Sequence, residues 1–343
     1  MARPNFAFKT STHTVCATTT PGVYLAEPGG HQLEFSLQEQ RVPEALCSTE
    51  MERAAMAWVM ARGGRELFLN GVRRPVSPDQ LGRPPQSPVR RLISIAPSNA
   101  EIVGALAATD LLVGVESSSD FPPEVQALPR LGPDLHVDMD ALAALEPDLV
   151  LASLTVPGME RNVTALEQLG IPYLVCAPRN LEEIRREIGR VGRAIGREAA
   201  AQQCIKRMDQ AIAEFGTRRR SRPVRVYLEW WPKPMFSPGS TCWSNELIEL
   251  AGGKNVFQHL PTQSGEVEPA DVVAADPEVI FLSWCGVPQS KLNPERVYAR
   301  KGLEQVSAIR NRRVFPIDEN LLGRPGPRVV EGIAAMAEKL AEV

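Results

Sequence analysis

The 343 residues carry 38 basic and 41 acidic side chains, which gives a formal net charge of −3. A chain of this length supports a large core and two or three domains, and its nearly balanced charge argues against a nucleic-acid surface, which needs a basic stripe. No apolar run approaches the roughly 20 residues needed to span a bilayer. The six cysteines are scattered without a CxxC pair, which favours free thiols over a disulfide framework or a zinc site.

Residues 1–90 are interpreted as an N-terminal extension whose organisation the sequence leaves open. A capping-box pattern at Thr49 predicts a helix, residues 66–73 read as a hairpin, and five prolines predict a stiff linker over 75–88. The extension is either a small appendage that leans on the main body, a mostly disordered segment or an over-long translated start. Its first residues form no recognisable secretory signal, so composition alone predicts a cytoplasmic protein.

Residues 91–180 are predicted to form a first α/β lobe. Its expected strands are 92–96, 111–115, 148–152 and 172–176. Helices expected from Ser98 and over 159–169 alternate with these strands. Apolar strands that alternate with helices indicate a parallel sheet covered on both faces.

A connecting helical region follows over 181–222 and leads into a second α/β lobe over 223–343. The region is expected to break at Gly196 and to continue as a long helix to about residue 218. The second-lobe elements are expected at 224–229, 244–250, 278–283, 314–317 and from 327 to the end of the chain. The predicted fold is therefore α/β, with two doubly wound parallel-sheet lobes joined by a single long helix and a ligand cleft between them.

Two segments read almost as copies of each other and support this division. Residues 139–153 (MDALAALEPDLVLAS) and 269–283 (PADVVAADPEVIFLS) each combine a short amphipathic helix, an acid–Pro–acid break and an apolar strand that ends in serine. A repeated helix–strand plan predicts two similar lobes that face each other, and two facing lobes form a cleft for a ligand.

Signatures of catalysis are absent from the sequence. It contains no GxSxG, HExxH or P-loop, and no GxGxxG after a strand. His136 and His259 are the histidines of the two lobes and the candidate metal ligands, but lone histidines at such surfaces are usually solvated. The chain is therefore predicted not to be an enzyme, and no metal site is assigned.

The tryptophans of the second lobe are the strongest hint of a binding site. Trp230 and Trp231 follow a buried strand, so they cannot both point into one core. Trp284 follows the strand of the second repeat copy, at the same edge of the sheet, where open α/β sheets bind ligands. Aromatic loops at strand ends suit a large, flat, partly apolar ligand. The alternative interpretation is that these rings seal the core of the lobe. Residues Asn320 to Arg324, which follow the last strand, are expected at the cleft rim.

Taken together, these segments resemble the periplasmic binding proteins of the vitamin B12 and iron–siderophore importers. The resemblance runs from about Arg91 to Leu340. The segments that carry it are 95–101 (IAPSNAE), 113–115 (VGV), 119–123 (SDFPP), 145–150 (LEPDLV), 250–257 (LAGGKNVF) and 276–280 (DPEVI). The run at 119–123 and the aromatic loop after residue 229 favour the cobalamin-binding branch.

The resemblance implies non-covalent capture of a corrinoid, with no catalytic cofactor, and delivery to an ABC importer permease if the chain is exported. It also implies a monomer. Trp230 matches a position where aromatic rings flank the corrin in that branch, whereas the other such positions fall on Ser118, Asp134 and Ser264, which are not aromatic. The full set of expected ligand-binding residues is Pro97, Ser98, Asn99, Ser118, Asp134, Trp230, Trp231, Ser264, Trp284, Asn320 and Arg324.

In the family each lobe also carries a surface acid that pairs with arginines of the importer. Asp140 occupies that position in the first lobe. Its second-lobe counterpart is Ala270, with Glu268 and Asp271 beside it, so these two acids are the expected substitutes in docking.

Other functions stay open at this point. A ferric-siderophore or haem binder of the same architecture would rely on Arg324 and Arg328. A chelatase-like or corrinoid-handling enzyme of the cytoplasm would rely on His136 or His259. A chain that is not exported would be a cytoplasmic corrinoid carrier.

Overall fold

In the computed structural model, residues 53–61, 75–216 and 222–343 are described in full, and the strands and first helix between residues 4 and 75 are described by their backbone. The chain forms two compact units. The first comprises residues 1–104, 108–177 and 194–196, and the second comprises 105–107, 178–193 and 197–343. Each unit is described by itself below.

The N-terminal part of the first unit contains a sheet in which consecutive strands are neighbours. Its described strands are β1 (Pro4–Lys9), β2 (Thr14–Thr18), β3 (Tyr24–Glu27), β4 (Glu34–Phe35), β5 (Gln40–Val42), β6 (Glu66–Leu69) and β7 (Val72–Pro75). Helix α1 (Thr49–Ala61) lies in the chain between β5 and β6, the two neighbours that pair in parallel. The antiparallel pair β6–β7 is the hairpin expected over 66–73, and its turn lies outside the described residues.

The segment expected to be a linker carries structure of its own. A short 3-10 helix, η2 (Pro78–Gln80), precedes β8 (Gly82–Arg83). Strand β8 pairs antiparallel with β12 (Tyr173–Cys176), the last parallel strand of the first lobe. Residues 82–83 are thus part of the sheet of the first lobe.

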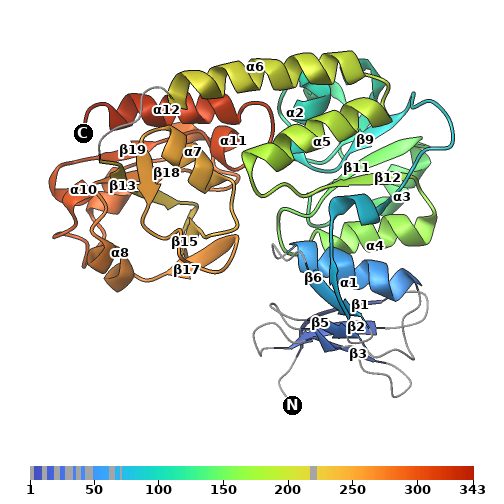
Figure 1. The fold of residues 1–343 in the computed structure, drawn as a ribbon, viewed down its shortest axis with the longest axis horizontal. Helices are drawn as coiled ribbons and strands as arrows, with labels where there is room; N and C mark the ends of the chain where they lie inside the picture. Colours follow the sequence, from blue (N-terminus) through green and yellow to red (C-terminus); the bar gives the residue numbers. More distant parts are fainter. Residues whose placement is uncertain are drawn as a thin grey trace. The chain divides into compact units, whose positions relative to one another are not determined.

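The sheet of the first lobe has the order β10-β9-β11-β12-β8, and all of its neighbours except β8 are parallel. Its other strands are β9 (Leu92–Ser94), β10 (Leu112–Val115) and β11 (Leu149–Ser153). Helix α2 (Pro97–Ala105) lies on one side of the sheet, and α3 (Met139–Ala144) and α4 (Glu160–Leu169) lie on the other (Figure 1). Two further 3-10 turns, η3 (Thr109–Leu111) and η4 (Pro123–Ala127), complete the described elements of the lobe.

Two helices lead from the first lobe to the second. Helix α5 (Leu181–Ala194) is followed by Gly196, whose φ of 67° is a left-handed conformation that glycine adopts without steric cost. The 19-residue helix α6 (Glu198–Gly216) then spans about 28 Å. The predicted helix break at Gly196 is confirmed, and so is the long helix.

The second lobe repeats the parallel plan with the order β16-β13-β18-β19. Its elements are β13 (Val224–Glu229), α7 (Ser244–Leu250), β16 (Gly253–Asn255), α8 (Pro269–Ala275), β18 (Val279–Leu282), η5 (Gln289–Lys291), α9 (Glu295–Tyr298), α10 (Ser307–Arg310), β19 (Val314–Pro316), α11 (Glu319–Leu322) and α12 (Val329–Leu340). A small antiparallel sheet of β14 (Trp231–Pro232), β15 (Met235–Pro238) and β17 (Ser264–Val267) is added to it.

The two repeat segments are confirmed as equivalent helix–strand units, α3–β11 and α8–β18. In both, the acid before proline takes a left-handed conformation, with φ of 46° at Glu146 and 41° at Asp276. Each lobe places its repeat strand third in its sheet, next to the strand that starts the lobe. The expected fold class of two parallel α/β lobes is therefore correct, and the cleft between them stays a prediction.

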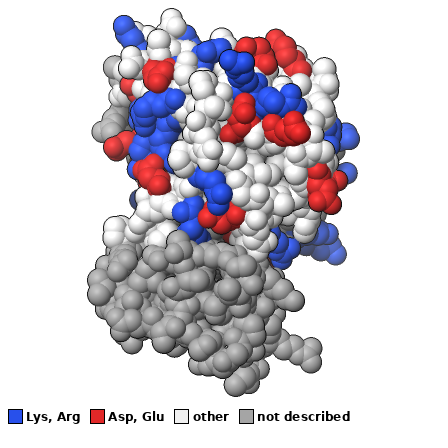
Figure 2. All heavy atoms as spheres, turned by 90° about the vertical axis from the view of Figure 1, so that its right-hand side faces the viewer, with Lys and Arg blue, Asp and Glu red and all other residues white. Residues whose placement is uncertain are grey.

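The surface of the described residues shows no single-sign charged field on the face drawn in Figure 2, where basic and acidic side chains are interspersed. Within the described part of the chain, no helix combines the length and the apolar character needed to cross a bilayer.

Candidate ligand-binding site

Trp230 lies at the carboxyl end of β13, directly after the last strand residue. Its backbone N–H donates to the Phe236 carbonyl at 2.9 Å, and its side chain is 8% exposed. The indole ring packs at 6.1 Å against that of Trp243. The indole Nε1 has no hydrogen-bond partner in the structure, which leaves a buried donor unpaired at this edge of the sheet.

Trp231 is the next residue and faces the opposite way, since successive side chains of an extended chain alternate. It is 41% exposed, and its Nε1 donates to the Lys233 carbonyl at 3.1 Å. Its backbone pairs with Phe236 in the β14–β15 hairpin, so the ring is held on a short antiparallel ribbon. The pair therefore combines one buried ring and one large exposed ring at the edge where the central strand ends.

Trp284, for which both a ligand-facing and a core-sealing role were left open, lies directly after the end of β18 and the buried Ser283. It is 5% exposed, and its Nε1 donates to Glu229 Oε1 at 3.0 Å. Little of the ring is left for a ligand, so the core-sealing interpretation fits Trp284 better than the ligand-facing one.

Glu229 is the centre of a buried polar cluster that was not predicted from the sequence. The carboxylate is fully buried and also accepts from Tyr227 Oη at 3.0 Å and from both Nη atoms of Arg300, at 2.5 and 3.0 Å. Burial, followed by the Glu229 charge, raises the pKa of Tyr227 well above its ordinary value. Burial lowers the pKa of Arg300, but the hydrogen bonds and the charge of Glu229 outweigh this effect, and the pKa of Arg300 is raised overall. The one feature of the sequence that could have indicated this cluster is a charged residue at the end of the apolar strand VRVYLE.

Ser283 is a second unpaired polar group at the same edge. It follows β18, donates its backbone N–H to the Glu229 carbonyl at 3.0 Å, and is fully buried, while its Oγ has no partner. Trp230 and Ser283 therefore lie at the ends of neighbouring parallel strands, each with an unpaired side-chain hydrogen-bonding atom.

The first-lobe residues expected at the ligand site lie at three places. Pro97, Ser98 and Asn99 open α2, where Ser98 and Asn99 are buried and Asn99 Nδ2 donates to the Ala152 carbonyl at 3.0 Å. Ser118 is exposed in the turn after β10, and its N–H donates to Glu116 Oε2 at 2.5 Å. Asp134 is half-buried, and burial raises the pKa of its carboxyl.

The remaining second-lobe residues lie farther along the chain. Ser264 is exposed at the start of β17, Asn320 is half-buried in α11, and Arg324 is buried just after α11. Arg328, expected to matter for an anionic ligand, forms an ion pair with Glu331 at 3.5 Å.

The expected docking acids lie on the short helices of the repeat. Asp140 is exposed in the first turn of α3, after Asp138 caps the helix. Ala270 occupies the corresponding position in α8. There Asp271 Oδ2 accepts from the N–H of Glu268 at 2.9 Å, so Asp271 stabilises the helix start while the exposed Glu268 carboxylate precedes it.

His136 and His259 are both exposed, as solvated histidines would be. Among the described residues, no group of three or more His, Cys, Asp or Glu side chains is arranged to hold a metal ion.

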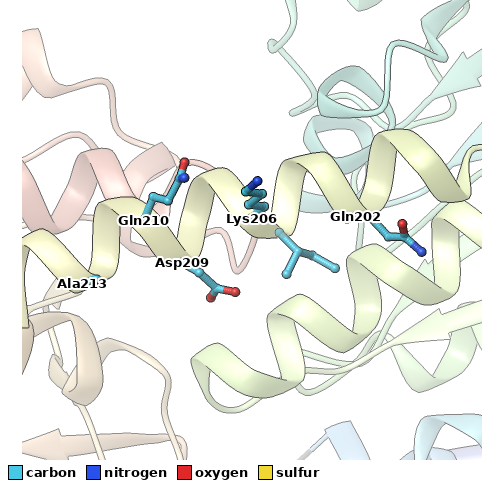
Figure 3. Close-up of a pocket in the computed structure, with 6 residues that line it drawn as sticks. Gln202, Lys206, Asp209, Gln210 and Ala213 are labelled. Atoms are coloured by element: carbon cyan, nitrogen blue, oxygen red, sulfur yellow. The ribbon is translucent and has the colours of Figure 1, made fainter.

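Two hollows of the second unit lie beside the connecting helices and away from the expected ligand residues. The larger, about 450 Å³, runs along α6 past Gln202, Lys206 and Asp209 (Figure 3). The smaller, about 320 Å³, lies between residues of α5, α6 and α7, including Arg185, Phe215 and Glu249. Neither contains a residue proposed to touch the ligand.

Two lobes with equivalent parallel sheets, joined in sequence by a helical region, define the class of solute-binding proteins. The sequence profile of the family described as periplasmic binding protein matches residues 92–321. The chain belongs to this family, and it is a solute-binding protein.

Several relatives cover nearly the same part of the chain. The uncharacterized ABC transporter substrate-binding lipoprotein YvrC of Bacillus subtilis is 29% identical over 262 residues, which are 73% of this chain and 80% of YvrC. A vitamin B12-binding protein of Vibrio cholerae is 26% identical over 259 residues, 75% of this chain and 91% of the relative. The crystal structure of the vitamin B12-binding protein BtuF of Vibrio cholerae matches with a TM-score of 0.65 and 26% identity, over 74% of this chain and 97% of that one. The haem-binding protein HutB of the same organism, at 21% identity, shares the fold.

Proposed function

We propose that the chain binds cobalamin or a related corrinoid, carries out no chemistry on it, and delivers it to an ABC importer. The observation that carries this proposal is the pair Trp230–Trp231 at the carboxyl edge of the second-lobe sheet. The similarity to proteins named as vitamin B12-binding supports it.

The exposed ring of Trp231 suits the apolar face of a flat macrocycle. Burial of apolar surface contributes about 25 cal/mol per Å², so a few hundred Å² of macrocycle face would supply several kcal/mol before the costs of association. The hydrogen-bonded hairpin holds the ring in place before binding, which reduces the entropy lost when the ligand arrives.

Two arginines of the second lobe are already paired with acids of the same lobe. The Arg300 guanidinium is used by the buried Glu229, and the Arg328 guanidinium is paired with Glu331. Corrins carry carboxamide side chains, whereas haem and many ferric siderophores carry anionic groups. Because Arg300 and Arg328 are already paired with acids, this pairing supports a corrinoid over an anionic ligand.

We further propose that the importer contacts the starts of α3 and α8, through Asp140 on the first lobe and Glu268 on the second. The exposure of both carboxylates supports this assignment. Asp271 is also exposed, and its carboxylate accepts from the N–H of Glu268, so it belongs to the same proposed docking surface.

The test is calorimetry of the purified chain with cyanocobalamin, dicyanocobinamide, haemin and a ferric hydroxamate, combined with absorbance spectra of the mixtures. We expect saturable binding of the two corrinoids and a shift of their visible bands. Trp231→Ala should weaken binding by about tenfold or more, since it removes 1.4 kcal/mol or more of contact. Val273→Ala, which truncates an exposed apolar side chain of the same lobe, is the matched control. Saturable binding of haemin or the siderophore with no binding of either corrinoid would overturn the proposal.

A further inference from the structure

Helix α1 has no polar face in its second half. Residues 54–61 (AAMAWVMA) are all 7% exposed or less, and the largest of them, Trp58, is 2% exposed. A helix that is apolar all round has to be covered on every side. Here α1 packs on α4 and contacts β6, and its side chains belong to the same core as Val163 and Leu166 of α4.

Arg53, the residue directly before this apolar stretch, ties α1 to three elements of the first lobe. Its Nη2 donates to the Gly82 carbonyl of β8 at 2.7 Å and to Tyr173 Oη of β12 at 3.3 Å. Its Nε lies 3.2 Å from Glu167 Oε1 of α4, and Tyr173 Oη donates to Glu167 Oε2 at 2.8 Å. The Arg53 guanidinium therefore joins α1 to strands β8 and β12 and to helix α4.

Strand β8 closes the sheet at β12. Open edge strands expose unpaired backbone groups and favour association with other chains, and Arg83 and Gly82 pair with Tyr173 and Leu174 at this edge. Gly82 has a φ of 116°, and a Cβ on it would come within 2.8 Å of the Tyr173 carbonyl oxygen. Glycine at this position is thus what allows the two strands to approach.

Helix α1 lies outside the part of the chain that the family profile matches. The family profile begins at residue 92. The structure of BtuF from Vibrio cholerae is matched over 97% of its length by 74% of this chain, which leaves that protein no room for a segment of this size. Helix α1 therefore adds to the matched part of the chain and supplies part of the core of the first lobe, and β8 supplies one edge of its sheet.

We propose that helix α1, together with strand β8, is a built-in partner segment of the first lobe, seated on the surface formed by α4 and β12. This surface is occupied by the chain itself, so it is closed to the importer and to a second copy. The segment and the lobe unfold as one unit, and removal of the segment exposes both an apolar helix face and a strand edge.

The test is to cut the full chain between the segment and the lobe. Gln86, Ser87 and Pro88 are exposed, so a protease recognition sequence inserted after Ser87 gives a chain that can be cleaved when folded. We expect fragments 1–87 and 88–343 to stay together in size-exclusion chromatography and to separate only in denaturant. If fragment 88–343 elutes alone as a folded monomer, with the unfolding midpoint of the intact chain, the proposal is wrong. Aggregation of fragment 88–343 after forced separation would support it.

Three variants test the contact surface between the segment and the lobe, called the seam, at Arg53, Trp58 and Gly82. In the cut chain, Trp58→Ala and Arg53→Met should each weaken fragment association roughly tenfold or more, because they remove a buried ring and a charged hydrogen-bonding group. Gly82→Ala should weaken it as well. Gly286→Ala is its control, since Gly286 also has a positive φ, of 69°, but has open space around it. Equal fragment association in the wild type and in all three seam variants would contradict the assignment of this surface.

Discussion

The indole Nε1 of Trp284 donates to Glu229 Oε1 at 3.0 Å, which joins the residue after β18 to the last residue of β13 through a fully buried carboxylate. Arg300 neutralises the same carboxylate from the loop that follows α9. The Glu229 cluster, made up of Glu229, Tyr227, Trp284 and Arg300, thus fixes two loops at the edge where Trp230 and Trp231 lie. Glu229 is a positioning residue, because its own side chain is covered on all sides.

Glu229→Gln should therefore destabilise the second lobe and weaken ligand binding indirectly. The amide leaves the Arg300 charge buried without its partner, which costs about 3 kcal/mol and lowers the unfolding midpoint by several degrees. Near-ultraviolet circular dichroism should lose tryptophan bands before any ligand is added. Glu266→Gln, which changes an exposed acid of the same lobe, is the control and should change neither the unfolding midpoint nor the spectrum. If the Glu229→Gln protein keeps the wild-type midpoint and bands, Glu229 is not a positioning residue.

The second lobe should become less stable at low pH, because the carboxylates of Asp276 and Glu278 become protonated. The N–H of Ser307, together with its hydroxyl and the Arg225 guanidinium, lowers the pKa of Asp276. Burial opposes the shift in Glu278, but hydrogen bonds from Arg222 and Arg225 lower the pKa of that carboxyl overall. Because both folded pKa values lie below the ordinary values of 3.8 and 4.5, the two acids stabilise the fold above about pH 4.5 and lose this contribution as the pH falls further.

Thermal unfolding between pH 7 and pH 3 tests this expectation. Asp276→Asn and Glu278→Gln should flatten the decline of the unfolding midpoint below pH 4.5, whereas Glu124→Gln, an exposed acid of the first lobe, should leave it steep. A decline that is the same in all four proteins would show that other groups cause it.

Docking to an importer should be unequal between the lobes. Asp140→Ala removes the acid of the first lobe and should reduce stimulation of importer ATPase activity strongly. Ala270→Asp restores the missing counterpart on α8 and should increase it, because a charge is gained at an exposed helix start that favours acids. Ligand affinity is the control readout and should be the same in both variants. A loss of stimulation on Ala270→Asp would contradict the proposed equivalence of the two helices.

Thiol reactivity should single out Cys285. Burial raises the pKa of the Cys242 thiol to about 12 and also raises that of Cys204, so both stay protonated at pH 8. Cys285 is exposed. In a Cys16→Ser/Cys47→Ser background, a disulfide reagent should modify one thiol rapidly, and Cys285→Ser should abolish this rapid phase. The remaining thiols should react only on unfolding, and fast labelling of Cys242 would contradict its burial.

Most of the lobe architecture could be predicted from the sequence because it rests on local patterns. The apolar strands, the glycine break at Gly196 and the duplicated acid–Pro–acid segments each depend on residues that are close in the chain. Helix α7 was predicted with its observed ends. Strand β8 was not, since two residues between prolines carry no period, and only the distant edge of β12 gives them a strand partner.

The site was less predictable for the same reason. The sequence indicated that Trp230 and Trp231 could not share a core, and they do not. It gave no means to see that Trp284 would be held by Glu229, because that contact spans 55 positions and depends on two strands being neighbours. The pairing of the buried Glu229 carboxylate could not be predicted either, because Arg300, which neutralises it, lies 71 positions away in the chain.

The small sheet β14-β15-β17 joins the two surfaces of the second lobe for which functions are proposed. Trp231 pairs with Phe236, and Phe236 pairs with Glu266, so these three residues form one row across the ladder. Strand β17 ends at Val267, and Glu268 then caps α8. The ring proposed to touch the ligand and the acid proposed to touch the importer are thus separated by two rows of backbone hydrogen bonds and two residues of chain. A ligand that shifts the Trp231 hairpin would move the start of α8 with it, which would give the importer a mechanical means of distinguishing a loaded carrier from an empty one.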